Sequence, residues 1–301
     1  MIFLEKKMNF LGKELNVYKA SLHNHSNVSD GEYTPQEIIK LYAAENYDVF
    51  AFTDHRKTNP VDEYDPCGMT LISGIELHPR DVYEWHLLAL GVPHGFSAEY
   101  PAAQWAINAV NNVGGVIFCA HPTWCGIPSQ TIAPLHGLAG IEVSNSGCRY
   151  IGKENNETVW DELTNMSILY PALATDDTHH SSEMFRNWTM IAAPDKSVES
   201  LIEALRKGSF YATQGPEFSS ITLENGIFKA EFSEAEEVVL ISIEYLGCCL
   251  NAPDYPCRGD YKLISSIEVD VKNHKRIKGR PFRCRIKDNR GRYAWTPVFC
   301  A

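Results

Sequence analysis

The chain has 301 residues, of which 44% are hydrophobic and 22% are charged, and these values are ordinary for a globular protein with a core of normal size. The formal net charge of −11 argues against a partner that is duplex nucleic acid or an anionic membrane, although bound metal ions can still attract a phosphate. We expect a cytoplasmic protein, because the amino-terminal residues lack the apolar run of a signal peptide and no stretch approaches about 18 consecutive apolar residues. Nine scattered cysteines without a C-x-x-C pair predict free thiols.

Between residues 17 and 212, short apolar runs alternate with helical patterns, which is typical of β/α units and a largely parallel sheet. The first helix is predicted to begin after Thr34, because Thr34 and Glu37 form a capping box and Pro35 occupies the first helical position. Strands are predicted at residues 17–26, 47–53, 70–77, 85–92, 116–120, 139–146 and 168–176, and further helices at 101–113 and 198–207.

The pattern changes after Gly215-Pro216. The runs that follow have β character and little helical period, and turn sequences such as Asp288-Asn289-Arg290-Gly291 separate them. The sequence therefore predicts an α/β domain over residues 1–215 and a small antiparallel, β-sandwich-like domain over residues 216–301. The predicted strands of this second domain are residues 219–225, 226–233, 237–246, 265–271 and 282–288.

Candidate metal ligands stand mostly at the ends of the predicted strands. His23 and His25 are two residues apart in a strand, so both imidazoles face the same side and suit a metal bound at about 2.0–2.1 Å. Any one such residue, taken alone, is more readily an ordinary core or loop residue. A whole set at the edge where parallel strands end would need a cation to hold it. The other candidates are Asp30, His55, Glu76, His86, His121, Asp177 and His179.

The ordered segments SLHNHS, SDG, FTDH, GIEL, WHLLALG, AHP, IEVSN and TDDTH resemble the polymerase and histidinol phosphatase (PHP) superfamily over residues 17 to about 215. The resemblance implies a distorted seven-stranded β/α barrel that binds two or three divalent ions of manganese, iron or zinc. It implies a first ion on His23, His25, Glu76 and Asp177, a second on Glu76, His86 and His121, and a third on Asp30, His55 and His179. The segments HLLALG, DDTH and LRKGSFYATQGP look like the carbamate-hydrolase-like CehA/McbA branch.

Five further residues are candidates for catalysis or substrate binding, each with a simpler alternative. Arg56 follows His55 and is suited to grip an anionic group, or it is a solvated surface arginine. His180 is a candidate proton donor or an exposed loop histidine. Trp124 forms a wall of the substrate site or packs in the core. Asn145 ends the strand IEVSN and Arg149 follows it, and both are expected to line the site. The alternatives are loop capping for Asn145 and a solvated surface position for Arg149.

The expected substrate is a small, anionic molecule, and the first hypothesis is a phosphoesterase. A water between two ions loses its proton near neutral pH and becomes a bridging hydroxide nucleophile, while Glu76 serves both ions. The alternatives are hydrolysis of a carboxylic ester, amide or carbamate, and a metal-stabilised binding or regulatory module. Thr123, Trp124 and Cys125 stand where some PHP nucleotidases have a phosphate-binding arginine, which weakens the nucleotidase interpretation.

Overall fold

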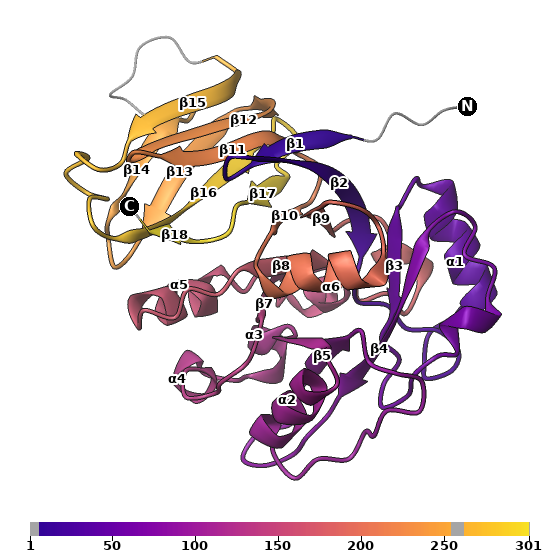
Figure 1. Cartoon of the computed structure of the whole chain (residues 1–301). Helices are drawn as coiled ribbons and strands as arrows, with labels where there is room; N and C mark the ends of the chain where they lie inside the picture. The colour runs from indigo at the N-terminus through magenta and orange to yellow at the C-terminus, as the bar shows by residue number, and fades with distance from the viewer. Residues whose placement is uncertain (1–5, 254–261, 301) are drawn as a thin grey trace.

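The computed structural model describes residues 6–253 and 262–300, which form a mixed α/β fold with many strands and few helices. Figure 1 shows an α/β part that carries the helices and an all-β part built by the carboxy-terminal strands. The helices are α1 Pro35–Ala44, α2 Ala103–Asn112, α3 Pro122–Cys125, α4 Ser129–Ile132, α5 Glu157–Asn165 and α6 Val198–Arg206. The strands of the α/β part are β2 Lys13–Ser21, β3 Val49–Phe52, β4 Thr70–Leu77, β5 Leu87–Leu90, β6 Val116–Cys119, β7 Gly140–Asn145, β8 Ala172–Thr175, β9 Trp188–Ala193 and β10 Phe210–Thr213.

Helix α1 begins as the sequence predicts. The Thr34 side chain accepts a hydrogen bond from the backbone N–H of Glu37, and the Glu37 carboxylate accepts one from the Thr34 N–H at 2.9 Å. Helices α2 and α6 lie within the ranges predicted for them. The short helix α5 was not predicted, and it lies between β7 and β8.

The predicted strands pair in chain order, but the sheet is not uniformly parallel. Strands β2, β3 and β4 are parallel, as are β6, β7 and β8, whereas β5 runs antiparallel to both β4 and β6. The physical reason is the short link of residues 78–86 between β4 and β5, which contains no crossover helix of the kind that a parallel neighbour needs. An isolated parallel bridge between Asn24 and Thr178 connects the segments that follow β2 and β8.

Strands β9 and β10 were missed by the sequence prediction. Strand β9 runs antiparallel to β2, with Asn16 opposite Ala193, and β10 runs antiparallel to β9. Strand β10 then pairs with β17, so that the sheet continues from the α/β part into the all-β part.

The all-β part begins behind residue 215, but one amino-terminal strand joins it. Strand β1 (Lys7–Phe10) pairs with β2 in a hairpin and also with β11, where Asn9 lies opposite Ser220. Met8 and Phe10 are buried in the same core as Phe228 and Phe282. The domain boundary near residue 215 stays a prediction. Strand β1 packs with the all-β part, although it precedes that boundary in the chain. The remaining strands are β11 Phe218–Glu224, β12 Ile227–Ala235, β13 Glu237–Ser242, β14 Gly247–Asn251, β15 Ile264–Asp270, β16 Pro281–Lys287, β17 Tyr293–Trp295 and β18 Phe299–Cys300.

A group of ion pairs around the buried Arg283 connects β16 to α5. Arg283 is 1% exposed, and its Nη1 donates to Asp161 at 2.5 Å while its Nη2 donates to Glu157 at 3.3 Å. The guanidinium also lies over the Trp160 ring at 4.3 Å. Arg285 adds a second contact to Glu157 at 3.1 Å. These contacts fix the all-β part against the helix that follows β7.

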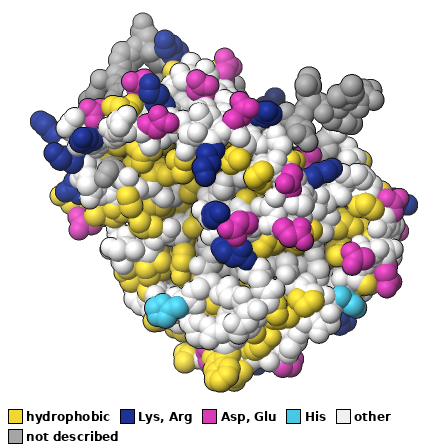
Figure 2. Space-filling view, viewed as in Figure 1, with side chains coloured by type: hydrophobic (Ala, Val, Ile, Leu, Met, Phe, Trp, Pro, Cys, Tyr) yellow, Lys and Arg dark blue, Asp and Glu magenta, His cyan; other side chains and the backbone are white. Residues whose placement is uncertain are grey.

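Three sequence predictions concern the surface and the thiols. Among the described residues, no helix combines the length and the apolar character that a membrane crossing requires. On the face drawn in Figure 2, cationic and anionic side chains lie among one another. Six of the described cysteines are free, as predicted, namely Cys67, Cys119, Cys125, Cys148, Cys284 and Cys300, and Cys257 lies outside the described residues.

Candidate metal centre

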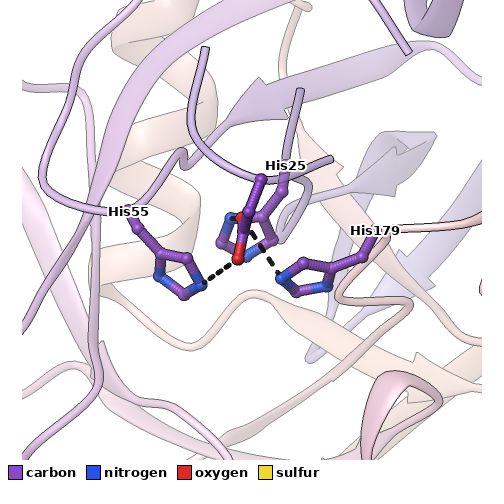
Figure 3. A group of neighbouring side chains, drawn as sticks. His25, His55 and His179 are labelled. Carbon is purple, nitrogen blue, oxygen red and sulfur yellow. Dashed lines mark ion pairs between the residues drawn. The ribbon is translucent and has the colours of Figure 1, made fainter. Parts of the chain in front are cut away.

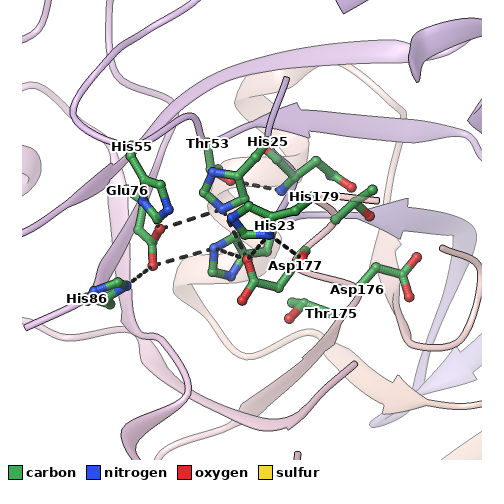
Figure 4. A network of polar contacts seen from close by, with 12 residues as sticks. His23, His25, Thr53, His55, Glu76, His86, Thr175, Asp176, Asp177 and His179 are labelled. Atoms are coloured by element: carbon green, nitrogen blue, oxygen red, sulfur yellow. Dashed lines mark hydrogen bonds and ion pairs between the residues drawn. The ribbon is translucent and has the colours of Figure 1, made fainter. Parts of the chain in front are cut away.

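The structure brings all nine predicted ligands to one edge of the α/β part. Figure 4 shows those at the centre of the group, namely His23, His25, His55, Glu76, His86, Asp177 and His179. Most of them lie at or just after the carboxyl end of a strand. His86 instead precedes β5, and because β5 is antiparallel its beginning lies at the edge where the parallel strands end. The segments that supply ligands are those that follow β2, β3, β6 and β8, the end of β4, and the start of β5.

Glu76 lies at the centre of the cluster and is fully buried. Its Oε1 is 2.8 Å from His86 Nδ1 and 3.3 Å from His121 Nε2. Its Oε2 is 2.6 Å from His55 Nδ1 and 3.6 Å from His25 Nε2. The two carboxylate oxygens therefore face different sets of imidazoles, as a carboxylate that serves two ions would.

Asp177 is the second buried carboxylate of the cluster. Its Oδ1 lies 3.0 Å from His25 Nε2 and 3.1 Å from His23 Nε2, and its Oδ2 lies 3.7 Å from His121 Nε2. Asn145, which the sequence placed at the site, donates to Asp177 Oδ2 at 3.1 Å and to Glu142 at 2.9 Å. Asn145 is fully buried and does not line the cavity at the cluster, so its hydrogen bonds position these two carboxylates, and the substrate-binding role given to it stays a prediction.

A third group surrounds Asp30, whose side chain is 54% exposed. Its carboxylate lies 3.5 Å from His55 Nε2, 3.6 Å from His179 Nε2 and 3.8 Å from His25 Nδ1. Figure 3 shows these three imidazoles arranged around one point. This group is the outermost of the cluster.

The donor atoms fit divalent metal ions. His23 Nε2, His25 Nδ1 and Glu76 Oε2 are buried and have no hydrogen-bond partner among the described residues, although other donor atoms of the cluster lie close by. Burying such atoms without a partner is costly, and a cation between them removes that cost. Neutral imidazole and carboxylate together suit zinc, iron or manganese.

Charge in the cluster is strongly coupled. Burial lowers the pKa of His23, but the carboxylates of Asp177, Glu142 and Glu76 outweigh burial and raise that pKa well above its usual value. Burial raises the pKa of Glu76, but the surrounding imidazoles, His86 first among them, hold that pKa well below its usual range. The Glu76 carboxylate is therefore ionised and available as a ligand at neutral pH.

Sequence reasoning missed Glu142, a fully buried carboxylate on β7. Glu142 Oε1 lies 2.7 Å from His23 Nδ1 and accepts a hydrogen bond from Thr175 at 2.7 Å, and Oε2 accepts from the backbone N–H of His121 at 2.9 Å. A carboxylate behind a histidine ligand fixes the ring and its tautomer. The available signal was a glutamate in an otherwise apolar strand, which is rarely buried without a partner.

Asp54 and His78 also lie beside the cluster. Asp54 accepts hydrogen bonds from the backbone N–H and hydroxyl of Ser26 and from Ser29 and Asn59, so it holds the loop that carries Asp30. Asp54 therefore has a structural role, although it stands directly before the ligand His55 in the chain. His78, which was not predicted as a site residue, has its Nε2 2.8 Å from His55 Nδ1.

A cavity of about 290 Å³ opens onto the cluster. Trp124 lines it, 42% exposed, and its ring lies 5.2 Å from that of His86 and 5.3 Å from that of His121. Among the described residues, no arginine or lysine lines this cavity. Its lining consists of Asp30, His55, His86, His121, Trp124, Gly147, Cys148, Asp177 and His179.

The structure does not bring Arg56, Arg149 or His180 into the lining of this cavity. Arg56 has a side chain 52% exposed and lines a neighbouring cavity of about 540 Å³. Arg149 donates to the Tyr150 hydroxyl and to the Ser182 carbonyl, both at 2.7 Å. The His180 side chain is 65% exposed. The catalytic and binding roles given to these three residues stay predictions.

Two of the ligands have strained backbone. His121 has φ of 24° and Asp177 has φ of 51°, and Arg56, beside His55, has φ of 56°. Positive φ is uncommon for residues other than glycine and costs about 1–3 kcal/mol. Such strain is concentrated at functional sites, and here it turns side chains at the strand ends.

A comparison with known protein families matches the part of the chain that carries most of these ligands. Residues 21–117 match the family model of the PHP domain. This range contains His23, His25, Asp30, His55, Glu76 and His86. No curated protein matches the chain.

Solved structures resemble the fold at low sequence identity. A two-domain protein from Bacteroides vulgatus that contains a predicted PHP-like metal-dependent phosphoesterase is 14% identical, with a TM-score of 0.53 and 99% of each chain covered. An amidohydrolase from Chromobacterium violaceum, with bound sulfate and no metal, is 17% identical, with a TM-score of 0.44, and covers 55% of this chain and 88% of its own. A protein from Bifidobacterium adolescentis named as a metal-dependent phosphoesterase is 16% identical, with a TM-score of 0.43, and the match covers 62% of this chain and 94% of that one. The first of these likenesses shows that the two-part fold occurs in another protein.

Proposed function

We propose that this protein is a metal-dependent hydrolase of the PHP type whose activity is phosphoester hydrolysis. The observation that carries the proposal is the convergence of nine imidazole and carboxylate ligands around Glu76, with buried donor atoms that have no hydrogen-bond partner among the described residues. The PHP-domain match over residues 21–117 supports it.

We infer two to three divalent ions of manganese, iron or zinc at this edge. Strands β2 to β8 pair in chain order, and the bridge between Asn24 and Thr178 joins the segments that follow the first and the last of them. This arrangement supports the distorted seven-stranded barrel of the superfamily. The ligands are those of the resemblance. His23, His25, Glu76 and Asp177 would hold one ion, Glu76, His86 and His121 a second, and Asp30, His55 and His179 a third.

Bound divalent ions would polarise the scissile group and lower the pKa of water, which is the chemistry that the reaction needs. The protein's own residues prepare the site for those ions. Glu142 and Asn145 fix His23 and Asp177 by hydrogen bonds. Trp124 lies beside His86 and His121 and offers an apolar wall to the substrate.

The cavity supports a second candidate, hydrolysis of a neutral carboxylic ester, amide or carbamate. Its lining contains Trp124, and among the described residues it contains no guanidinium or ammonium group that would grip a phosphate. This composition agrees with the sequence resemblance to the CehA/McbA branch. A phosphoester would be held by the ions themselves, with Arg56 reaching the part of the substrate that extends into the neighbouring cavity.

Paired variants separate the two candidates. Arg56→Ala and Trp124→Ala are compared on the best substrate found in a screen of phosphate esters, carboxylic esters and carbamates. The exposed residues Arg276 and Trp105, changed to Ala, serve as matched controls.

If the substrate is a phosphoester, Arg56→Ala should lower kcat/KM. The expected loss of transition-state stabilisation is about 1.5 kcal/mol, the low end for a charged hydrogen bond, because the side chain is half exposed. Trp124→Ala should then have the smaller effect. If the best substrate is a neutral ester and Trp124→Ala lowers kcat/KM more than Arg56→Ala does, the second candidate would replace phosphoester hydrolysis. Unchanged phosphoesterase kinetics in Arg56→Ala would remove this residue from the site.

A further inference from the structure

The end of β4 carries a third pair of possible ligands with the spacing of the two pairs already described. Glu76 and His78 are separated by one residue, like His23 and His25 and like Asp177 and His179. In an extended strand such residues face the same side. His78 is absent from the ligand set that the family resemblance implies, yet its side chain is only 9% exposed and points into the cluster.

We propose that His78 is a metal ligand, and that it forms a divalent metal position with His55, Glu76 and His86. One donor atom from each of these four residues lies within 4.8 Å of the others. The closest three atoms are His78 Nε2, His55 Nδ1 and Glu76 Oε2. His78 Nε2 lies 2.8 Å from His55 Nδ1 and 3.6 Å from Glu76 Oε2, and the latter two atoms are 2.6 Å apart.

These separations suit ligands around one ion. Metal–ligand bonds of about 2.0–2.1 Å in tetrahedral geometry place neighbouring ligand atoms about 3.3 Å apart. Three imidazoles and one carboxylate are a donor set typical of zinc, and acceptable to manganese and iron. The His78 ring is stacked on that of His86, with centroids 4.0 Å apart, which fixes the direction of its Nε2.

Hydrogen bonding alone does not account for this contact. A single proton on His55 Nδ1 can be donated to His78 Nε2 or to Glu76 Oε2, but not fully to both. Glu76 Oε2 is buried and satisfies no hydrogen bond among the described residues, despite lying 2.6 Å from that nitrogen. A cation between the three atoms satisfies all of them.

The position also gives His55 a conventional environment. With Nδ1 as the ligand atom, the other ring nitrogen, Nε2, faces the Asp30 carboxylate at 3.5 Å. A carboxylate on the second nitrogen of a ligand imidazole is the usual outer partner. This differs from the resemblance, which groups His55 with Asp30 and His179 as ligands of a third ion.

The inference rests on the proposed function only in requiring that the cluster binds divalent ions, and metal counting tests it without an activity assay. His78→Phe keeps a ring against His86 and removes both nitrogens, and His78→Gln is a second variant of smaller steric change. His136→Phe, at an exposed position away from the cluster, is the matched control. Each full-length protein is purified from medium supplemented with Mn²⁺ and Zn²⁺. Its metal content per chain is then measured, and Zn²⁺ is titrated calorimetrically into the chelator-stripped protein.

Both His78 variants should hold about one equivalent of metal per chain fewer than the wild type. The affinity of the corresponding Zn²⁺-binding step should fall by more than about 100-fold, which exceeds the effect of losing an outer partner of a ligand. The control should match the wild type. Folded His78 variants with wild-type metal content and affinity would overturn the inference and leave the proposed function standing. A wild-type chain with less than one equivalent would overturn both.

Discussion

The strand-end cluster and the contact between β16 and α5 both bury charged or ionisable groups, but they do so differently. In the β16–α5 contact, each terminal nitrogen of Arg283 reaches a carboxylate, on Asp161 and on Glu157, and Nε is the atom of this guanidinium that has no hydrogen-bond partner among the described residues. In the cluster, imidazoles and carboxylates converge closely. Even so, Glu76 Oε2 and His25 Nδ1 have no hydrogen-bond partner among the described residues.

The difference separates structural from functional burial of polar groups. A buried arginine opposite two carboxylates is neutralised within the protein, so it holds two elements together and needs no ligand. A set of imidazole and carboxylate donor atoms directed at common points is suited to bind a cation. The two regions should therefore respond differently to substitution.

The largest effect is expected from Glu76→Ala, because this carboxylate faces imidazoles on both of its oxygens. The variant should lose at least one metal ion, and the rate should fall by about 10³-fold or more, as when an electrostatic stabiliser of the transition state is removed. Metal analysis and steady-state kinetics measure both effects, with the exposed Glu231→Ala as the control. Full metal occupancy together with full activity would show that Glu76 has been wrongly assigned.

Arg283→Met should mainly affect stability. Removal of the guanidinium takes away the contact to Asp161 and leaves Glu157 with Arg285 alone. The free energy of unfolding should fall by about 3 kcal/mol, the low end for a broken buried pair, because Asp161 is 43% exposed. Urea unfolding of the variant and of Arg276→Met, at an exposed position, measures the difference. Metal content per folded chain should be unchanged. A variant as stable as the control, or one that loses metal while folded, would contradict the contrast between the two regions.

The smallest effect is expected from Glu142→Gln, which keeps the shape of a side chain that orients the ligand His23. Metal affinity should fall by about 10- to 100-fold, the usual effect of losing an outer partner of a ligand, while the ion count at saturating metal stays the same. Calorimetric titration of the stripped protein measures the affinity, with Glu231→Gln as the control. Unchanged affinity would mean that Glu142 has only a structural role.

Local features of the fold were predictable from the sequence. The capping box at Thr34 and Glu37 fixes the start of α1, because the groups that satisfy one another are three residues apart. The direction of β5 and the pairing of β1 with β11 were not predictable, since both depend on contacts between distant segments. Short buried strands such as β9 carry no alternation that would reveal them.

The site was predictable to the extent that strand ends share one edge. His23, His55 and Asp177 were expected together because of their positions at those ends, and the structure places them in one cluster. A position next to a ligand did not predict where a side chain points. Arg56 follows His55 directly, and the chain there turns it toward the neighbouring cavity. Glu142 supports the site from within a strand, and no strand-end argument could identify it.

The most direct test of the central claim is the number of metal ions that the purified protein carries. After expression in medium supplemented with manganese, iron and zinc, elemental analysis should find two to three equivalents per chain. Chelation should abolish hydrolysis, and restoring the ions should recover it. Less than about one equivalent per chain, or hydrolysis that persists in the stripped protein, would contradict the account of the strand-end cluster as a multinuclear metal centre.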